Sequence, residues 1–163
     1  MTALFLCSVP ALPIPCYTFK DMGYSSSRTY SIAWHADAKA DLEHIRKIDE
    51  NVAADIEVFF EEARDNQLTL DNLNRNGYVQ HGDVPFDISE WGEAKRKKYN
   101  LWRLKFLFVN GLAAGYRIIY AFHGIEYRYY LLAIVDRSFD YNIHHERSKQ
   151  ILAAYDALDI PRY

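Results

Sequence analysis

Residues 101–141 constrain the fold of this chain more than any other stretch. Apolar and aromatic residues dominate it, with turn-forming pairs at Asn110-Gly111 and His123-Gly124. This spacing predicts three consecutive strands joined by short connections, which together make a meandering sheet. Alternation along the first strand places the cations Arg103 and Lys105 on one face. The other face of that strand is expected to carry apolar side chains: Trp102, Leu104, Phe106 and Phe108.

The segments that flank this stretch predict helices packed on the sheet. Residues 30–34 (YSIAW) have the composition of a strand. Apolar residues then recur at intervals of three and four over residues 37–48 and 52–63, which is typical of two amphipathic helices. A final helix is expected around residues 151–158, stopped by Pro161. We therefore predict an α+β fold in the order β-α-α-β-β-β-α, with an N-terminal strand and a helical hairpin packed on a mainly antiparallel sheet.

Two segments fall outside this pattern. Residues 1–28 are apolar up to Pro15, lack a basic start and are too short to span a membrane, so we interpret them as an N-terminal extension. Residues 68–92 lose their periodicity and contain Asn76-Gly77, His81-Gly82 and Pro85, which are turn signals. We interpret them as an insertion within a single domain that covers residues 29–163.

Cationic residues are concentrated on and around the predicted sheet. The formal net charge of −3 at pH 7 argues against a protein that coats nucleic acid through bulk positive charge. Residues 91–150 nevertheless hold 11 Lys and Arg against 5 Asp and Glu, so they carry +6 and the remaining residues −9. Within this segment, residues 93–98 (EAKRKK) predict a short helix that borders the meander. Such a run is usually a solvated face, and its alternative is a basic rim for nucleic acid.

The spacing of cysteine and histidine residues does not match a metal site or a disulfide framework. Cys7 and Cys16 both lie near the N-terminus, and the 6 histidines are scattered without an HExxH-type pair. A chain of 163 residues, 50% of them hydrophobic, is long enough to bury a core without such cross-links. We therefore expect no metal and no cofactor.

Three short phrases resemble the RelE/ParE superfamily of bacterial toxins in their order and spacing. They are LWRLK at residues 101–105, GYRIIY at 115–120 and AIVDRSFDY at 133–141, and the likeness extends over residues 30–158. The resemblance implies a small toxin that a cognate antitoxin neutralises in a hetero-oligomer. It also implies one of two activities: the RelE-like branch cuts mRNA on the ribosome without a metal, and the ParE-like branch inhibits DNA gyrase. Because one fold carries both, the choice rests on the site.

The RelE-like positions hold residues whose chemistry suits RNA cleavage. Cleavage by the RNA's own 2′-hydroxyl needs a proton acceptor, positive charge near the phosphorus and an acid for the leaving 5′-oxygen. By resemblance, Arg117 lies against the scissile phosphate, and Arg137 is the arginine that ends the last long strand. A guanidinium is permanently charged and grips two phosphate oxygens at once. The alternative for both arginines is an ordinary surface ion pair, for Arg137 with Asp136 or Asp140.

The remaining site candidates follow from the same resemblance and from charge. Tyr141 matches the tyrosine that stacks on a base or assists proton transfer in RelE-like proteins. Stacking suits it better, because an unperturbed phenol with a pKa of about 10 is a poor base at neutral pH. Simple packing is its alternative, since the chain has 13 tyrosines. Lys105 is the candidate proton acceptor, and Lys95, Lys97 and Lys98 compete for that role. Residues expected to bind RNA are Arg103, Lys95, Lys97, Lys98 and His144.

Three functions remain open at this point. Arg117, Arg137 and Tyr141 together favour a RelE-like endoribonuclease that acts on translated mRNA in the cytoplasm. The first alternative is a ParE-like gyrase inhibitor without nuclease activity. The second is a catalytically silent protein-binding module on the same scaffold. The acidic total charge and the insertion both depart from the usual pattern of the family.

Overall fold

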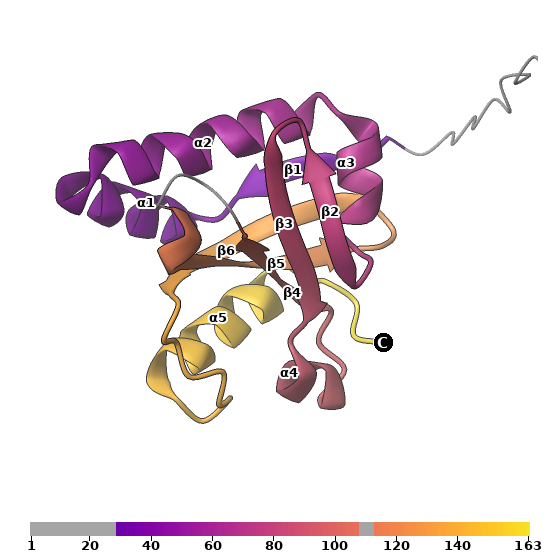
Figure 1. Cartoon of the computed structure of the whole chain (residues 1–163). Helices are drawn as coiled ribbons and strands as arrows, with labels where there is room; N and C mark the ends of the chain where they lie inside the picture. The colour runs from indigo at the N-terminus through magenta and orange to yellow at the C-terminus, as the bar shows by residue number, and fades with distance from the viewer. Residues whose placement is uncertain (1–28, 108–112) are drawn as a thin grey trace, which may run out of the picture.

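The computed structural model describes residues 29–107 and 113–163, and these form an α+β fold with a 6-stranded sheet (Figure 1). The strands are β1 (Ser31–Trp34), β2 (Gly77–His81), β3 (Val84–Glu90), β4 (Leu101–Phe106), β5 (Tyr116–His123) and β6 (Arg128–Asp136). The helices are α1 (Ala36–Ile48), α2 (Glu50–Arg64), α3 (Gln67–Asn72), α4 (Gly92–Arg96) and α5 (Glu146–Ala157), and a 3-10 turn (Ala113–Gly115) precedes β5. The predicted fold class, α+β, is confirmed.

The sheet has the order β1-β6-β5-β4-β3-β2. β1 runs parallel to β6, and every other neighbouring pair is antiparallel, so the sheet is mainly antiparallel as predicted. The meander β4-β5-β6 is present. Its second turn lies at the predicted His123-Gly124, where the ring Nδ1 of His123 accepts a hydrogen bond from the Glu126 N–H at 3.1 Å. The predicted turn at Asn110-Gly111, and Phe108 before it, lie outside the described residues.

Helices cover both faces of the sheet (Figure 1). The helices α1, α2 and α3 pack on one face, where Leu104 of β4, Ile118 of β5 and Leu131 of β6 are fully buried. The helices α4 and α5 lie on the other face, where they bury Ile119 and Leu132. Side chains alternate along each strand. A residue next to one of the strand residues buried against α1–α3 therefore faces the layer of α4 and α5.

Capping side chains define the two predicted helices of the hairpin. α1 begins after His35, whose ring Nδ1 accepts a hydrogen bond from the Asp37 N–H at 3.2 Å. Asp49 separates α1 from α2, and its carboxylate accepts from the N–H groups of Asn51 and Val52 at 3.0 and 3.3 Å. Such caps satisfy N–H groups that the first turn of a helix leaves unpaired. The apolar stripes then face the sheet, as their periodicity predicted.

The predicted order of elements lacks α3, β2 and β3, which lie almost entirely within residues 68–92. The sequence predicted an insertion broken by turns, whereas these residues contain most of α3 and the hairpin of β2 and β3, which continues the sheet beyond β4. Gly82 adopts a φ of +56° in the hairpin turn, a conformation that glycine enters without steric cost. Phe86 and Ile88 of β3 are at most 1% exposed. This hairpin is therefore part of the main core.

The C-terminal helix begins earlier than its apolar pattern predicted. α5 starts at Glu146, because His145 caps it: its ring Nδ1 accepts a hydrogen bond from the Arg147 N–H at 3.3 Å. The helix ends at Ala157, ahead of Pro161. The prediction of an extension over residues 1–28 falls outside the described residues. None of the described helices combines the length and the apolar character that crossing a membrane requires.

Candidate functional site

Three predicted cations share the face of the sheet that α5 covers. Arg103 and Lys105 alternate with the buried Trp102 and Leu104 along β4, as predicted. Lys105 lies directly opposite Arg117 of β5 in the register of the two strands. Residues paired across neighbouring strands project to the same side of a sheet. The strand geometry therefore brings the two predicted catalytic cations, Lys105 and Arg117, next to one another.

Arg117 is held rigidly within this face. It is only 9% exposed, and its Nη1 donates hydrogen bonds to the carbonyl oxygens of Ala114 at 3.2 Å and Tyr116 at 2.8 Å. Burial lowers the pKa of Arg117, and the nearby charges of Arg137 and Arg103 act in the same direction. An arginine remains protonated nonetheless. The guanidinium is therefore a fixed, poorly hydrated positive charge that an incoming anion would stabilise.

Arg137 lies beside Arg117 but is exposed to solvent. Its backbone N–H donates to the carbonyl oxygen of Gly115 at 2.7 Å, which fixes the end of β6 against the start of β5. The expected competitor, Asp136, instead accepts hydrogen bonds from the N–H and hydroxyl of Ser138 at 2.8 and 2.6 Å. Those bonds lower the pKa of Asp136, so it stays ionised. The side chain of Arg137 makes no ion pair within the described residues and is available to a ligand.

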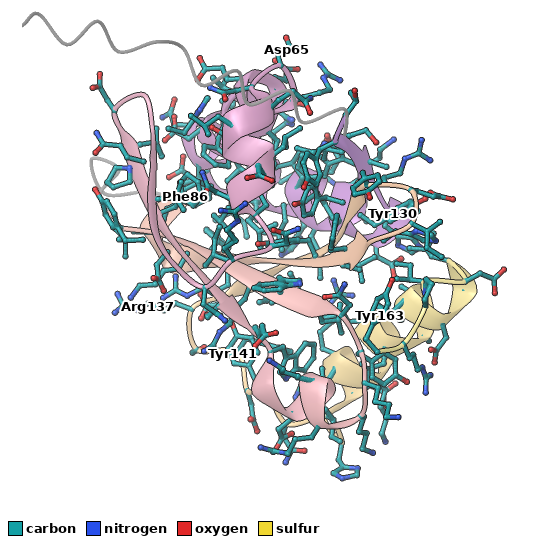
Figure 2. All side chains as sticks on the ribbon, turned by 90° about the vertical axis from the view of Figure 1, so that its right-hand side faces the viewer. Asp65, Phe86, Tyr130, Arg137, Tyr141 and Tyr163 are labelled. Atoms are coloured by element: carbon teal, nitrogen blue, oxygen red, sulfur yellow. The ribbon has the colours of Figure 1, made fainter. Side chains whose placement is uncertain are left out.

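Tyr141 lies next to the arginines because the connection after β6 folds back over the sheet. Its carbonyl oxygen accepts a hydrogen bond from the indole Nε1 of Trp91 at 2.8 Å, and its ring packs edge-on against Trp91 and Phe139. The guanidinium carbon of Arg103 lies over the ring, 4.9 Å from its centroid. In Figure 2, Tyr141 and Arg137 project on the same side of the molecule, away from Tyr130 and Tyr163.

The hydroxyl group of Tyr141 is buried and has no hydrogen-bond partner among the described residues. Burial raises the pKa of Tyr141. The charges of Arg103 and Arg117 oppose this shift only in part, together with a contact between the hydroxyl and the Arg103 side chain that falls short of hydrogen-bond geometry. The phenol is therefore neutral at pH 7 and able to donate a proton. With Arg103 on one ring face and two aromatic rings at its edges, this geometry favours proton transfer over the stacking role expected from the sequence.

Four cations of this face have no anionic partner. Within the described residues, no carboxylate oxygen lies within 4.0 Å of their side-chain nitrogens, although Asp136 lies close enough to Arg117 for the two charges to interact. We call this set the cationic cluster; its members are Arg103, Lys105, Arg117 and Arg137. Like charges placed side by side destabilise a fold, so the arrangement is typical of a site that binds an anion.

Two residues of β3 belong to this site and were missed by sequence reasoning. Ser89 accepts a hydrogen bond from Nε of Arg103 at 2.6 Å and so orients that guanidinium. Asp87 pairs in register with Lys105 on its free side. The signal that would have found them is the alternation Phe86, Asp87, Ile88, Ser89, which is typical of a half-buried strand.

The other predicted RNA-binding residues lie on the two segments that border Tyr141, and the three lysines are far from Lys105 along β4. Lys95, Lys97 and Lys98 are exposed in and after α4, before the start of β4, whereas Lys105 lies near its end, four residues or about 13 Å further along the strand. Lys95 is paired with Glu90. His144 is exposed in the loop before α5, and its backbone N–H donates to Asn142. The Ile143 N–H donates to Glu93 of α4 at 3.0 Å, so α4 and the His144 loop lie side by side next to Tyr141.

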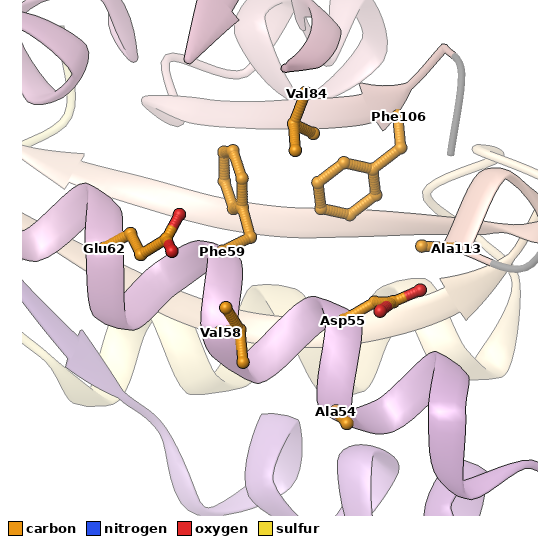
Figure 3. A pocket seen from close by; sticks show the side chains of 8 residues that line it. All are labelled: Ala54, Asp55, Val58, Phe59, Glu62, Val84, Phe106 and Ala113. Carbon is orange, nitrogen blue, oxygen red and sulfur yellow. The ribbon is translucent and has the colours of Figure 1, made fainter. Parts of the chain in front are cut away.

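A pocket on the opposite face of the sheet does not serve the same chemistry. It has a volume of about 190 Å³ and lies between α2, β3, β4 and the 3-10 turn (Figure 3). Its floor is apolar, with Phe59, Val84 and Phe106, and its charged residues are the carboxylates of Asp55 and Glu62. A phosphate would be repelled there. This pocket is therefore unsuited to binding a phosphate.

Thr69, His81 and Glu62 have the residue types of a nucleophilic triad but not its accessibility. The Oγ1 of Thr69 lies 2.8 Å from Nδ1 of His81, whose Nε2 lies 3.7 Å from the carboxylate of Glu62. Thr69 is only 4% exposed and His81 packs against Phe59. Of the three residues only Glu62 lines the pocket of Figure 3, so a molecule held there would not meet the Thr69 hydroxyl. These three side chains instead connect the β2–β3 hairpin to α2 and α3.

The comparisons with known proteins do not assign a family. Scans against protein-family models, curated proteins and solved structures each gave no match. In the described part of the chain, no three His, Cys, Asp or Glu side chains are gathered in a group that could hold a metal ion. The cationic cluster and Tyr141 are therefore the features of this chain that bear on its function.

Proposed function

We propose that this chain is a RelE-like toxin of a type II toxin–antitoxin system. In this proposal it is a metal-independent endoribonuclease that cuts mRNA on the ribosome, with the RNA's 2′-hydroxyl as nucleophile. The observation that carries the proposal is the cationic cluster without anionic partners, placed beside the buried, unpaired hydroxyl of Tyr141. Phosphate binding and proton donation are the two functions that this combination of groups suits best.

The arginines would bind the scissile phosphate. Arg117 is the anchor, because its two hydrogen bonds to backbone carbonyls fix the guanidinium before any ligand arrives. Arg103 is oriented by Ser89, and Arg137 is exposed and free to close on the phosphate from the solvent side. Preorganised positive charge stabilises the pentavalent phosphorus more than the ground state, because negative charge builds up there during the reaction.

The two remaining groups would move the protons. Lys105, the amine nearest to Arg117 in register, first releases its own proton to solvent, and its neutral amine then accepts the 2′-hydroxyl proton as the 2′-oxygen attacks the phosphorus. The bond from phosphorus to the 5′-oxygen then breaks, and the Tyr141 hydroxyl donates a proton to that oxygen. The products are a 2′,3′-cyclic phosphate and a free 5′-hydroxyl. Tyr141 suits the role of acid, because burial keeps its phenol protonated at neutral pH.

Dependence on the ribosome accords with the distribution of charge. A free ribonuclease with a net charge of −3 binds RNA weakly, because affinity for phosphate depends on positive charge. The ribosome would instead position the mRNA, so that only the local cationic cluster has to contact it. A cognate antitoxin would be the protein partner in a hetero-oligomer, and the site of action would be the cytoplasm, where mRNA is translated.

Primer extension on a defined mRNA in a reconstituted translation reaction tests the proposal. Wild type is expected to give cuts that require ribosomes. Arg137→Ala removes an exposed side chain and should slow cleavage by about 10²- to 10³-fold without unfolding the protein. Arg117→Lys keeps the charge but loses the two-pronged grip, so it should also be slow. Arg128→Ala, which removes a surface arginine paired with Glu126, is the matched control and should cut normally.

The outcomes separate the proposed nuclease from its alternatives. If wild type arrests growth while the mRNA stays intact, the nuclease proposal fails and DNA gyrase becomes the next target to assay. If Arg137→Ala, Arg117→Lys and Arg128→Ala all arrest growth like wild type, the cationic cluster has no part in toxicity. The third function, a silent binding module, would then be the better description.

A further inference from the structure

The β2–β3 hairpin widens the face that carries the cationic cluster. Tyr78 of β2 pairs in register with Asp87 of β3, Asp87 pairs with Lys105 of β4, and Lys105 pairs with Arg117 of β5. These four side chains form one row across the sheet, on the side away from α2. Val79, next to Tyr78, packs into the opposite core, as alternation requires. Tyr78 thus belongs to the same surface as the proposed phosphate site.

Tyr78 has the features of a base-stacking platform. It is 62% exposed, and among the described residues no second aromatic ring or cation covers its ring. Its hydroxyl donates a hydrogen bond to Gln80 on the same strand at 3.4 Å, which restrains the side chain along β2. Strands lie about 4.8 Å apart, so Tyr78 is about 10 Å from Lys105, within reach of a nucleotide next to the bound phosphate. Every base has a flat face that stacks on such a ring.

Asp87 lies between this ring and Lys105. Its carboxylate is half-buried and makes no hydrogen bond or ion pair within the described residues. A second phosphate beside it would be repelled, so the nucleotide in this position has to present its base rather than its backbone. A carboxylate accepts hydrogen bonds only, and it therefore selects a base edge that carries amino donors. Uracil is disfavoured, because its single donor on this edge, N3–H, lies between two carbonyl oxygens that a carboxylate repels.

We propose that Tyr78 and Asp87 form a base-recognition subsite next to the scissile phosphate, in which Tyr78 stacks on a base and Asp87 selects one that carries an amino group. This inference rests on the proposed function and adds the determinant of sequence preference. The subsite comes from residues 68–92, the segment that the sequence marked as an insertion. This segment, which departs from the expected element order, would thus take part in the choice of substrate.

The experiment measures ribosome-dependent cleavage of mRNAs that differ only in the base beside the cut. Tyr78→Ala should raise KM for the programmed ribosome roughly tenfold and leave kcat almost unchanged. Tyr78→Phe keeps the ring and should behave like wild type. Asp87→Ala should reduce discrimination against uracil by about tenfold. Tyr163→Ala removes a ring that is 64% exposed at the C-terminus and is the matched control.

The results distinguish the inference from the function beneath it. If wild type cuts mRNA and Tyr78→Ala shows the same KM and base preference, the subsite is overturned while the nuclease stands. If wild type cuts no mRNA, both are overturned. A Tyr78→Ala variant that cuts normally but loses binding to a co-expressed protein partner would assign the ring to a protein interface, and this also overturns the subsite.

Discussion

Lys105 and Arg117 stand directly opposite one another on the antiparallel strands β4 and β5, and within the described residues neither has a carboxylate within 4.0 Å. Two cations in opposed positions of a sheet repel each other and lower the stability of the fold. The cost is small, and a bound anion, a mutation or screening by salt reduces it. The pair therefore links the stability of the protein to its proposed function.

Lys105→Gln should stabilise the protein and abolish cleavage. The variant relieves the repulsion from Arg117, and the lost attraction of Asp87, which forms no ion pair with Lys105, offsets only part of that gain. The free energy of unfolding should rise by at most about 0.5 kcal/mol at low salt, and the gain shrinks at high salt because ions screen the repulsion. Urea unfolding at two salt concentrations measures both effects. Lys149→Gln, which removes an exposed lysine from α5, is the control and should change neither quantity. A loss of stability in Lys105→Gln would show that the lysine is held by contacts more favourable than the repulsion.

Tyr141→Phe should impair cleavage without impairing folding. The hydroxyl is buried with no hydrogen-bond partner in the described structure, so its removal should not lower the free energy of unfolding. Loss of a general acid slows cleavage by about 10²- to 10⁴-fold. Thermal melting and primer extension on the same preparation measure the two quantities.

Tyr155→Phe is the matched control for that variant. The Tyr155 hydroxyl accepts a hydrogen bond from the Asn100 N–H at 3.2 Å and donates one to the carbonyl oxygen of Pro161 at 2.9 Å. Its removal should cost about 1 kcal/mol of stability and leave the cleavage rate unchanged. If Tyr141→Phe instead behaves like Tyr155→Phe, the Tyr141 hydroxyl is structural and a different group is the acid.

The loss of stability in alkali should be traceable to Tyr120. Its hydroxyl is buried and donates to the carbonyl oxygen of Leu73 at 2.6 Å, and burial raises its pKa well above the usual value of 10.0. A raised pKa means that the contribution to stability is complete below about pH 10 and is lost as the pH rises above it, because the unfolded phenol ionises first. Tyr129, which donates to Leu70 at 2.7 Å, acts in the same direction.

Tyr120→Phe isolates this contribution. The variant should lose about 1 kcal/mol at pH 7, because the carbonyl of Leu73 is left without its donor. Above pH 10 its free energy of unfolding should fall less steeply than that of wild type, by about 1.4 kcal/mol per pH unit. Urea unfolding between pH 7 and alkaline pH measures the two slopes. Equal slopes would mean that Tyr120 ionises as readily in the folded protein as in the unfolded chain.

Periodicity in the sequence predicted the elements that face a continuous core. The stripes of α1 and α2 repeat at helical spacing, and alternation along β4 correctly separated Arg103 and Lys105 from the buried residues. The β2–β3 hairpin was missed because Gly82 and Pro85 were interpreted as turn signals that interrupt regular secondary structure. Pro85 lies at the second position of β3, near the end of the strand, where a missing N–H costs little.

The candidate site was only partly accessible from sequence. Resemblance to RelE-like proteins indicated Arg117, Arg137 and Tyr141, and their proximity in the fold accords with that hypothesis. The position of Tyr141 beneath Arg103 depends on how the connection after β6 packs on Trp91, and no local pattern encodes that contact. Asp87 could not be placed beside Lys105 until β3 was known to be a strand.

Phe86→Ala should unfold the whole domain rather than the hairpin alone. Phe86 of β3 is fully buried, lies opposite Phe106 of β4 in register, and packs against Phe59 of α2 with ring centroids 5.2 Å apart. Emptying this position costs about 3–5 kcal/mol, which is a large part of the stability of a typical domain. Thermal melting followed by circular dichroism should therefore show one transition at a much lower temperature. Tyr78→Ala, on the exposed side of the same hairpin, should melt like wild type. If residues 68–92 were an appended insertion, Phe86→Ala would keep the wild-type melting temperature and gain only a protease-sensitive hairpin.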